Sequence, residues 1–174
     1  MEKNLPVRKP NRLINFDYST EGAYFITICT HQRRKILSHI RVGEAICLPQ
    51  EKACPLQLTE LGKVVKDAIL NISKIYPYVL TDYYVIMPNH VHLILRIDDA
   101  EGGRQVASPT ISTIVGNMKR AVSKTIGYGI WQRSFHDHVI RDAKDYNEIA
   151  DYIEANPLNW EKDCFFNEGD KGEK

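Results

Sequence analysis

Hydrophobic and polar positions along the chain follow two different periods. Four stretches are rich in β-branched and aromatic residues or alternate between apolar and polar positions, which is typical of strands. Three stretches repeat apolar residues every three or four positions, which is typical of helices that bury one face. The predicted strands cover 23–30, 79–87, 90–97 and 134–141, and the predicted helices begin near 59, 108 and 142.

Particular residues mark the ends of these elements. Thr59 is a suitable N-cap for the first helix, and Pro77 ends that element. The pair Pro88-Asn89 is a turn signal, so the two middle strands should form a hairpin. Gly127 stops the second helix and Pro157 stops the third.

The order strand, helix, strand, strand, helix, strand, helix predicts an α+β fold. Its first six elements follow the order of the ferredoxin-like (split βαβ) fold, an antiparallel sheet with two helices on one face. The other face is then open for a site or for the last helix. We expect one domain over 1–174 with its core at about 20–160. The tails 1–16 and 161–174 are expected to be flexible, and residues 40–57 to form a short hairpin or loop.

Composition narrows the class of protein. The chain has 174 residues, of which 43% are hydrophobic and 26% charged, close to the average for soluble globular proteins. No apolar run is long enough for a membrane span, and the polar, basic first residues are unlike a signal peptide. The four cysteines form no CxxC pair, which is typical of reduced thiols in a cytoplasmic protein.

Charge is unevenly distributed along the chain. The total of +1 combines segments 1–41 and 104–144, each with a net charge of +5, with acidic segments 42–103 and 145–174, at −3 and −6. Basic patches of this kind are compatible with a polyanionic partner such as nucleic acid. The alternative is an ordinary solvated surface, which charge alone favours over nucleic-acid binding.

The pair His90 and His92 is the first candidate site. Alternate side chains of a strand share a face, so both imidazoles should point one way while Val91 and Leu93 pack under the helices. Two imidazoles placed like this can bind one metal ion. The alternative is a pair of half-buried histidines that are satisfied by hydrogen bonds.

The last predicted helix provides the second candidate, Tyr152. This tyrosine lies beside the apolar stripe and shares its side of the helix with Glu148 and Asn156, each four residues away. It could be a boundary residue with its ring on the core and its hydroxyl in water. A phenol and a carboxamide on one helical face could also reach a metal-bound phosphate together.

Several separated motifs together resemble a known family. MPNHVHLIL (87–95) resembles the His-hydrophobic-His (HUH) motif of single-tyrosine transposases. The chain as a whole resembles the REP-associated tyrosine transposases over residues 20 to 160. That resemblance rests on HQRR (31–34), WQRSFHDHVIR (131–141), Tyr152-Ile153 and Asn156-Pro157 in this order.

The resemblance implies a function and a set of roles. His90 and His92 would bind a divalent ion, Mg²⁺ or Mn²⁺, with Asn156 as third protein ligand and Tyr152 as nucleophile. Family members cut single-stranded DNA near a hairpin, form a 5′-phosphotyrosine link, leave a free 3′-hydroxyl and rejoin strands. Mg²⁺ prefers oxygen ligands, so imidazoles would suit Mn²⁺ or Zn²⁺ better.

Rival residues exist for both roles. His136 and His138 form a second alternating pair on the strand before the last helix, although they lack the MPNHVHL context. Tyr146 lies six residues before Tyr152, which is about 240° around a helix, so the two tyrosines cannot share a face. We prefer Tyr152 because it has Asn156 four residues later.

DNA contacts would come from the basic segments, and Trp131 or Tyr128 could stack on an unpaired base. The candidates for phosphate contacts are Arg33, Arg34, Lys119, Arg120, Lys124, Arg133 and Arg141. The partner would be single-stranded or hairpin DNA, and the protein a monomer or a homodimer. A different class is a non-catalytic nucleic-acid-binding module with a ferredoxin-like sheet. A third is a small metallohydrolase that uses a metal-bound water.

Overall fold

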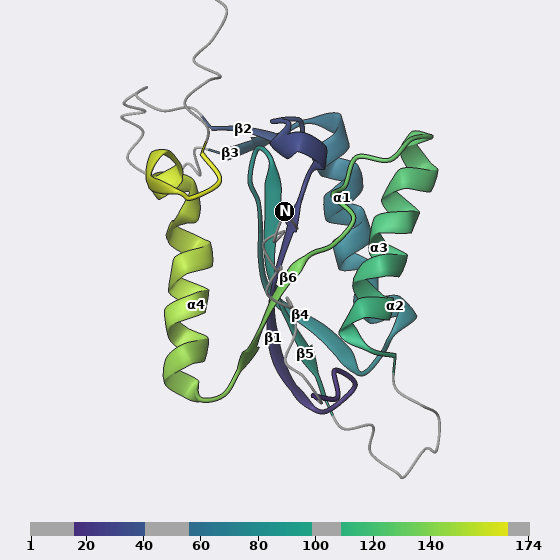
Figure 1. Ribbon diagram of the computed structural model, residues 1–174, viewed down its shortest axis with the longest axis vertical. Helices are drawn as coiled ribbons and strands as arrows, with labels where there is room; N and C mark the ends of the chain where they lie inside the picture. The colour runs from purple at the N-terminus through teal and green to yellow at the C-terminus, as the bar shows by residue number, and fades with distance from the viewer. Residues whose placement is uncertain (1–15, 41–55, 99–108, 167–174) are drawn as a thin grey trace, which may run out of the picture.

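The computed structural model describes residues 16–40, 56–98 and 109–166 (Figure 1). Expectations for the N-terminal tail, for most of the 40–57 segment and for the end of the acidic tail lie outside these residues.

The centre of the protein is a four-stranded antiparallel sheet in the order β4-β5-β1-β6. Its strands are β1 (Gly22–Cys29), β4 (Val79–Ile86), β5 (His90–Ile97) and β6 (His136–Ile140). β4 and β5 form the predicted hairpin. A separate two-stranded sheet pairs β2 (Ser38–Ile40) with β3 (Leu56–Leu58). The α+β class is therefore confirmed.

Helices cover both faces of the main sheet. α1, α2 and α3 lie on one face and α4 lies on the other (Figure 1). The helices are α1 (Glu60–Leu70), α2 (Ile72–Ile75), α3 (Ile111–Ile126) and α4 (Ala143–Ala155), with 3-10 helices η1 (His31–Arg33) and η2 (Asn156–Lys162). No helix in the described part of the chain is both long and apolar enough to span a bilayer.

Local sequence explains most helix ends. The hydroxyl of Thr59 accepts a hydrogen bond from the backbone N–H of Gly62, as its N-cap position predicts. α3 begins later than predicted, because Thr110 provides the cap by accepting from the N–H of Thr113. Gly127 ends α3 in the left-handed region, at φ 85°, which glycine adopts without strain.

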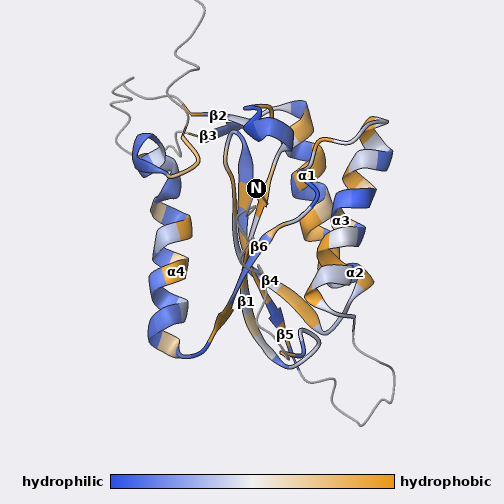
Figure 2. Cartoon of the chain, viewed as in Figure 1, coloured by the Kyte–Doolittle hydropathy of each residue, from blue (hydrophilic) through white to orange (hydrophobic). Residues whose placement is uncertain are grey.

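Strand alternation divides β5 between two cores. Val91, Leu93 and Leu95 are buried in the large core under α1 and α3. Ile94 is buried in a smaller core under α4, together with Ile153. Figure 2 shows that α1, α3 and α4 each combine hydrophobic and hydrophilic residues, as expected for helices with one buried face.

The chain after α4 differs from the prediction. α4 ends at Ala155, close to the predicted stop, but the 3-10 helix η2 follows directly and continues to Lys162, with Pro157 in its first turn, where proline is tolerated. The segment 163–166, which we expected to be flexible, packs against the α4 face of the sheet, where Phe165 and Phe166 join the smaller core. This return of the chain brings new residues to the histidines of β5.

Candidate metal and nucleophile site

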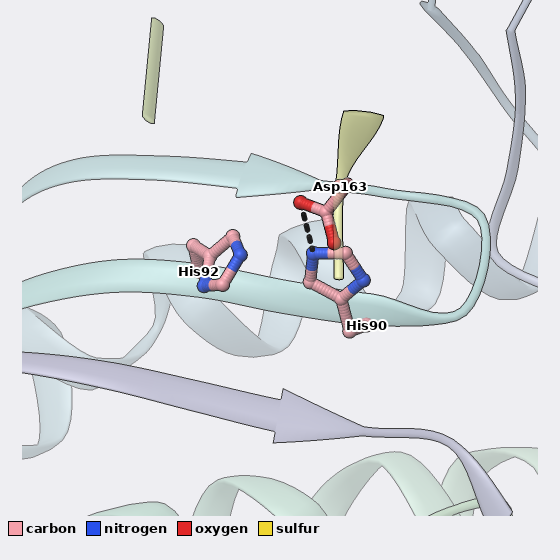
Figure 3. Close-up of side chains that lie close together, drawn as sticks. All are labelled: His90, His92 and Asp163. Atoms are coloured by element: carbon pink, nitrogen blue, oxygen red, sulfur yellow. Dashed lines mark ion pairs between the residues drawn. The ribbon is translucent and has the colours of Figure 1, made fainter. Parts of the chain in front are cut away.

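His90 and His92 project from β5 toward the α4 face of the sheet, as strand alternation predicts. Their exposed fractions are 0% and 2%, and their ring centroids lie 4.4 Å apart. Figure 3 shows both rings beside the carboxylate of Asp163, which reaches them from the segment after η2. The two imidazoles therefore lie in a closed space rather than on an open surface.

Each imidazole has a hydrogen-bond partner at Nδ1. Nδ1 of His90 lies 2.8 Å from Oδ1 of Asn89, and Nδ1 of His92 lies 2.8 Å from the hydroxyl of Thr27. Nε2 of His90 has no hydrogen-bond partner among the described residues, although it is buried. Nε2 of His92 lies 3.3 Å from the phenol oxygen of Tyr152. Nε2 of His90 is thus unpaired, while Nε2 of His92 contacts the phenol of Tyr152, and both atoms point to the α4 side.

Burial keeps both imidazoles neutral at ordinary pH. Desolvation, with a smaller contribution from the charge of Arg33, lowers the pKa of His90 to about 3. Desolvation also lowers the pKa of His92 to about 3, helped by His90 and opposed by the charge of Asp163. Neutral imidazole is the form that binds metal ions.

Tyr152 projects from α4 onto the same site. Its ring packs edge-on against His92 and Phe25, at centroid distances of 5.3 and 6.2 Å. Its hydroxyl donates to Oδ2 of Asp163 at 3.2 Å, while the side chain stays 42% exposed. Burial, followed by the negative charge of Asp163, raises the pKa of Tyr152. The phenol is therefore protonated, close to the imidazoles and accessible from outside.

Asn156 lies one turn further along, where α4 passes into η2. The side chain is 2% exposed, and Nδ2 donates to Oδ2 of Asp163 at 2.9 Å. Its carbonyl oxygen Oδ1 is buried without a hydrogen-bond partner among the described residues. A buried acceptor without a donor is costly, and a cation would satisfy it.

Asp163 is the site residue that sequence reasoning missed. Its carboxylate is 1% exposed and lies 4.0 Å from Nε2 of His90. One ligand atom each from His90, His92 and Asp163 lies within 4.8 Å of the other two. No local pattern separates Asp163 from the other acidic residues of the C-terminal segment, because its role depends on how η2 turns the chain back.

The donor set fits a divalent ion. Two neutral imidazoles, a carboxylate and an amide oxygen are typical ligands of first-row divalent metals such as Mn²⁺. The unpaired Nε2 of His90 and Oδ1 of Asn156 indicate which atoms would face the ion. The hydroxyl of Tyr152 lies 3.3 Å from Nε2 of His92, one of these possible ligand atoms.

Comparisons with known proteins identify the family. An uncharacterized protein of Haemophilus influenzae is 34% identical over 178 aligned residues, covering 91% of this chain and 93% of the relative. The REP-associated tyrosine transposase of Escherichia coli (strain K12) is 28% identical over 142 residues, covering 81% of this chain and 69% of the relative. This chain belongs to the REP-associated tyrosine transposase family.

A solved structure shares the fold of this chain. The structure of a REP-associated tyrosine transposase bound to a REP hairpin matches with a TM-score of 0.61 and 21% sequence identity, covering 88% of this chain and 74% of that chain. This likeness shows a shared fold. A scan against models of protein families finds no match.

The rival histidine pair lies at the edge of the sheet. His136 and His138 are exposed on β6, opposite Thr27 and Phe25 of β1. Nε2 of His138 lies 2.8 Å from the carboxylate of Asp145 at the start of α4. The pair belongs to no group of three possible metal ligands in the described part of the chain.

Tyr146, the rival candidate for the nucleophile, faces a different part of the protein. Its hydroxyl donates to Oδ2 of Asp82 on β4 at 2.8 Å. Burial and this hydrogen bond raise the pKa of Tyr146 to about 12. Tyr146 is therefore engaged at a β4 contact, whereas the phenol of Tyr152 meets the histidines.

The basic candidates for DNA contact fall into separate groups. Arg33 and Arg34 are exposed on η1 and directly after it, and Arg133 is exposed in the segment before β6. These segments lie together, since the N–H of His31 donates to the carbonyl of Ile130 at 2.7 Å. The guanidinium of Arg33 also lies over the ring of Phe165, 5.0 Å from its centroid. This group therefore flanks the histidines.

The remaining basic candidates lie elsewhere. Arg120 and Lys124 are exposed on α3, on the opposite face of the sheet from the histidines. Arg141 is exposed at the turn into α4. The ammonium group of Lys119 is hydrogen-bonded within the protein. It donates to the backbone carbonyl oxygens of residues 132, 133 and 134 at 2.6, 3.4 and 3.2 Å.

The two aromatic candidates for base stacking also differ. Tyr128 is 56% exposed after α3. The ring of Trp131 is partly buried against the large core. Only Tyr128 offers most of its ring to a partner.

Proposed function

We propose that this protein nicks and rejoins single-stranded DNA beside a hairpin, through a covalent 5′-phosphotyrosine at Tyr152. The proposal rests mainly on one observation: the phenol oxygen of Tyr152 lies 3.3 Å from Nε2 of His92. The hairpin as substrate is inferred from the relative that was solved with a REP hairpin.

A divalent ion, Mn²⁺ or Mg²⁺, would be held by Nε2 of His90 and His92, with oxygens from Asn156 and Asp163. When bound, such an ion polarises the scissile phosphate and stabilises charge on its non-bridging oxygens. Two imidazole ligands favour Mn²⁺ over Mg²⁺, which prefers an all-oxygen shell. Asp163 would add one negative charge to an otherwise neutral ligand set.

Tyr152 would carry out the covalent step. A phenol with a pKa near 10 is ionised in only about one molecule in a thousand at pH 7, so its proton must leave during attack. The phenol O–H bond breaks, the tyrosine oxygen bonds to phosphorus, and the bond from phosphorus to the 3′-oxygen breaks. That oxygen takes a proton and becomes a free 3′-hydroxyl. Attack by a 3′-hydroxyl on the phosphotyrosine reverses these changes and rejoins the strand.

Arg33, Arg34 and Arg133 are the basic residues best placed to contact phosphates beside the site. They come from two adjacent exposed segments that lie near the end of β1. In the sheet, this end of β1 pairs with His90. Phosphate contacts position a strand without reading its sequence. We therefore assign these arginines to holding the strand across the phenol, and not to recognition of the hairpin sequence.

A covalent-adduct assay tests the proposal. The full chain would be incubated with labelled single strands that flank a hairpin, in the presence of Mn²⁺, and run on a denaturing gel. We expect a protein–DNA band that disappears in Tyr152→Phe and persists in Tyr146→Phe.

Other outcomes would favour the other classes. DNA binding with no adduct under any divalent ion would instead favour a non-catalytic binding module. Turnover of a small phosphate ester that survives Tyr152→Phe would favour a metallohydrolase.

A further inference from the structure

Two buried polar side chains stand behind the candidate metal site and touch the imidazoles on the side away from it. We infer that Thr27 and Asn89 are positioning residues, which hold the two imidazole rings so that both Nε2 atoms point toward the proposed metal site. The inference rests on the proposed metal site. It concerns the ring nitrogens opposite the proposed ligand atoms, and it gives Thr27 and Asn89 a role behind the two histidines.

The amide of Asn89 determines which nitrogen of His90 has the proton. Nδ2 of Asn89 donates to the carbonyl oxygen of Phe165 at 2.9 Å, and a carbonyl can only accept. The amide is therefore oriented with Oδ1 toward His90, where it lies 2.8 Å from Nδ1. An amide oxygen also only accepts, so Nδ1 of His90 must have the hydrogen. The lone pair of this neutral ring is then on Nε2.

Thr27 acts on the second ring from the neighbouring strand. It lies directly opposite His92 in the register of β1 and β5, on the same face of the sheet. Its hydroxyl is 2.8 Å from Nδ1, and Phe25 stacks on the same imidazole at a centroid distance of 5.2 Å. Thr27 is 5% exposed, so water does not replace this bond. The hydroxyl and the stacked ring together restrict the rotation of His92.

Asn89 also connects the histidines of β5 to the segment after η2, which contains Asp163. Its bond to the carbonyl of Phe165 holds the segment after η2, and the N–H of Phe165 donates to Oδ1 of Asp163 at 2.7 Å. One buried side chain, 0% exposed, therefore orients His90 and fastens the segment with Asp163. Partners of this kind behind metal-binding histidines typically change metal affinity about 10- to 100-fold when removed.

Titration of the full chain with Mn²⁺ alone tests the role of Thr27. Thr27→Val keeps the shape of the side chain and removes the hydroxyl, and we expect it to weaken Mn²⁺ binding by about 10-fold or more. Thr27→Ser restores the hydroxyl and should restore the affinity. Thr81→Val is the matched control, because the buried hydroxyl of Thr81 has no hydrogen-bond partner among the described residues. Equal affinity in Thr27→Val and the natural chain would overturn the role of Thr27.

The same titration tests Asn89. Asn89→Ala should weaken Mn²⁺ binding by a similar factor, about 10-fold or more. Asn89→Asp retains an acceptor for His90 but no donor for Phe165, so it should bind more tightly than Asn89→Ala. An Asn89→Ala chain that folds and binds as well as the natural chain would overturn the role of Asn89.

A measurement on the metal-free protein separates this inference from the proposed function. Nitrogen-15 NMR of the imidazoles should show the neutral form with hydrogen on Nδ1 for His90. Thr27→Val should change the nitrogen shifts of His92 and leave those of His90 in place. Hydrogen on Nε2 of His90 would overturn the inference even if the DNA adduct forms. The expected tautomer without any Mn²⁺ binding would support the hydrogen bonds and refute the metal site.

Discussion

The phenol oxygen of Tyr152 lies 3.3 Å from Nε2 of His92, although 60 residues separate them along the chain. The side chains of His90 and His92 project from β5 to one face of the sheet, and α4 packs on that face. This packing brings Tyr152 and His92 together. The proposed nucleophile and the proposed metal ligands therefore belong to one site within a single chain. Five predictions follow from this site and its surroundings.

Removing the carboxylate of Asp163 should weaken metal binding. We expect Asp163→Ala to lower Mn²⁺ affinity at least as much as the loss of a residue behind the histidines, for which the change is about 10- to 100-fold. Asp163→Asn retains one oxygen and should bind Mn²⁺ more tightly than Asp163→Ala. Calorimetry with Mn²⁺ gives the comparison, and Asn156→Ala should show a loss of the same kind. Unchanged binding in Asp163→Ala would remove this residue from the ligand set.

Acid should destabilise the metal-free protein through the buried histidines. The pKa of both His90 and His92 is lowered to about 3 in the folded chain, whereas unfolded histidine titrates near 6.5. Between these values the unfolded chain binds protons that the folded chain does not. The free energy of unfolding therefore falls as the pH falls from about 6.5, by up to about 1.4 kcal/mol per pH unit for each ring. Urea unfolding at several pH values measures this loss of stability. His92→Gln should reduce the slope of the unfolding free energy against pH.

Tyr146 should prove to be structural. Tyr146→Phe removes the hydrogen bond to Asp82, which still pairs with Arg96 at 2.9 Å. We expect a loss of about 1 kcal/mol in the free energy of unfolding, with the DNA adduct retained. Thermal unfolding and the adduct gel provide the two measurements. Loss of the adduct from a folded Tyr146→Phe protein would argue against Tyr152 as nucleophile.

Lys119 should affect stability more than DNA binding. Its ammonium group fastens the segment before β6 through three backbone carbonyls, so Lys119→Met should cost about 1–3 kcal/mol of unfolding free energy. The salt dependence of DNA binding by the Lys119→Met variant should match that of the natural chain. Arg133→Ala, in contrast, should reduce the salt slope by about one phosphate contact without a stability change. Unchanged stability and a reduced salt slope in Lys119→Met would instead indicate that Lys119 contacts a phosphate.

Gly62 allows α1 to approach the chain before β2. A Cβ at this position would lie 2.0 Å from the carbonyl oxygen of Leu37, so Gly62→Ala should destabilise the protein by about 1–3 kcal/mol or more. Gly116, on α3, has nothing within 4 Å of its Cβ position. Gly116→Ala should be neutral or stabilising by up to about 1 kcal/mol. Urea unfolding of the two variants tests the contrast.

Sequence patterns predicted the elements that depend on local physics. Strand alternation was sufficient to put His90 and His92 on one face, because the side-chain period of a strand is two. The caps and stops at Thr59 and Gly127 were likewise local. The roles that the family resemblance implies for Tyr152 and Asn156 remain predictions for the experiments above.

Only the tertiary structure could decide which other residues surround the histidines. Asp163 lies in an acidic segment without a motif, and it reaches His90 because η2 turns the chain back over β5. Lys119 is a surface cation by sequence, yet it binds carbonyls of a segment 13 to 15 residues later. Periodicity constrains which face a side chain takes within its own element. Contacts between distant segments depend on how the helices pack, and no local pattern encodes that packing.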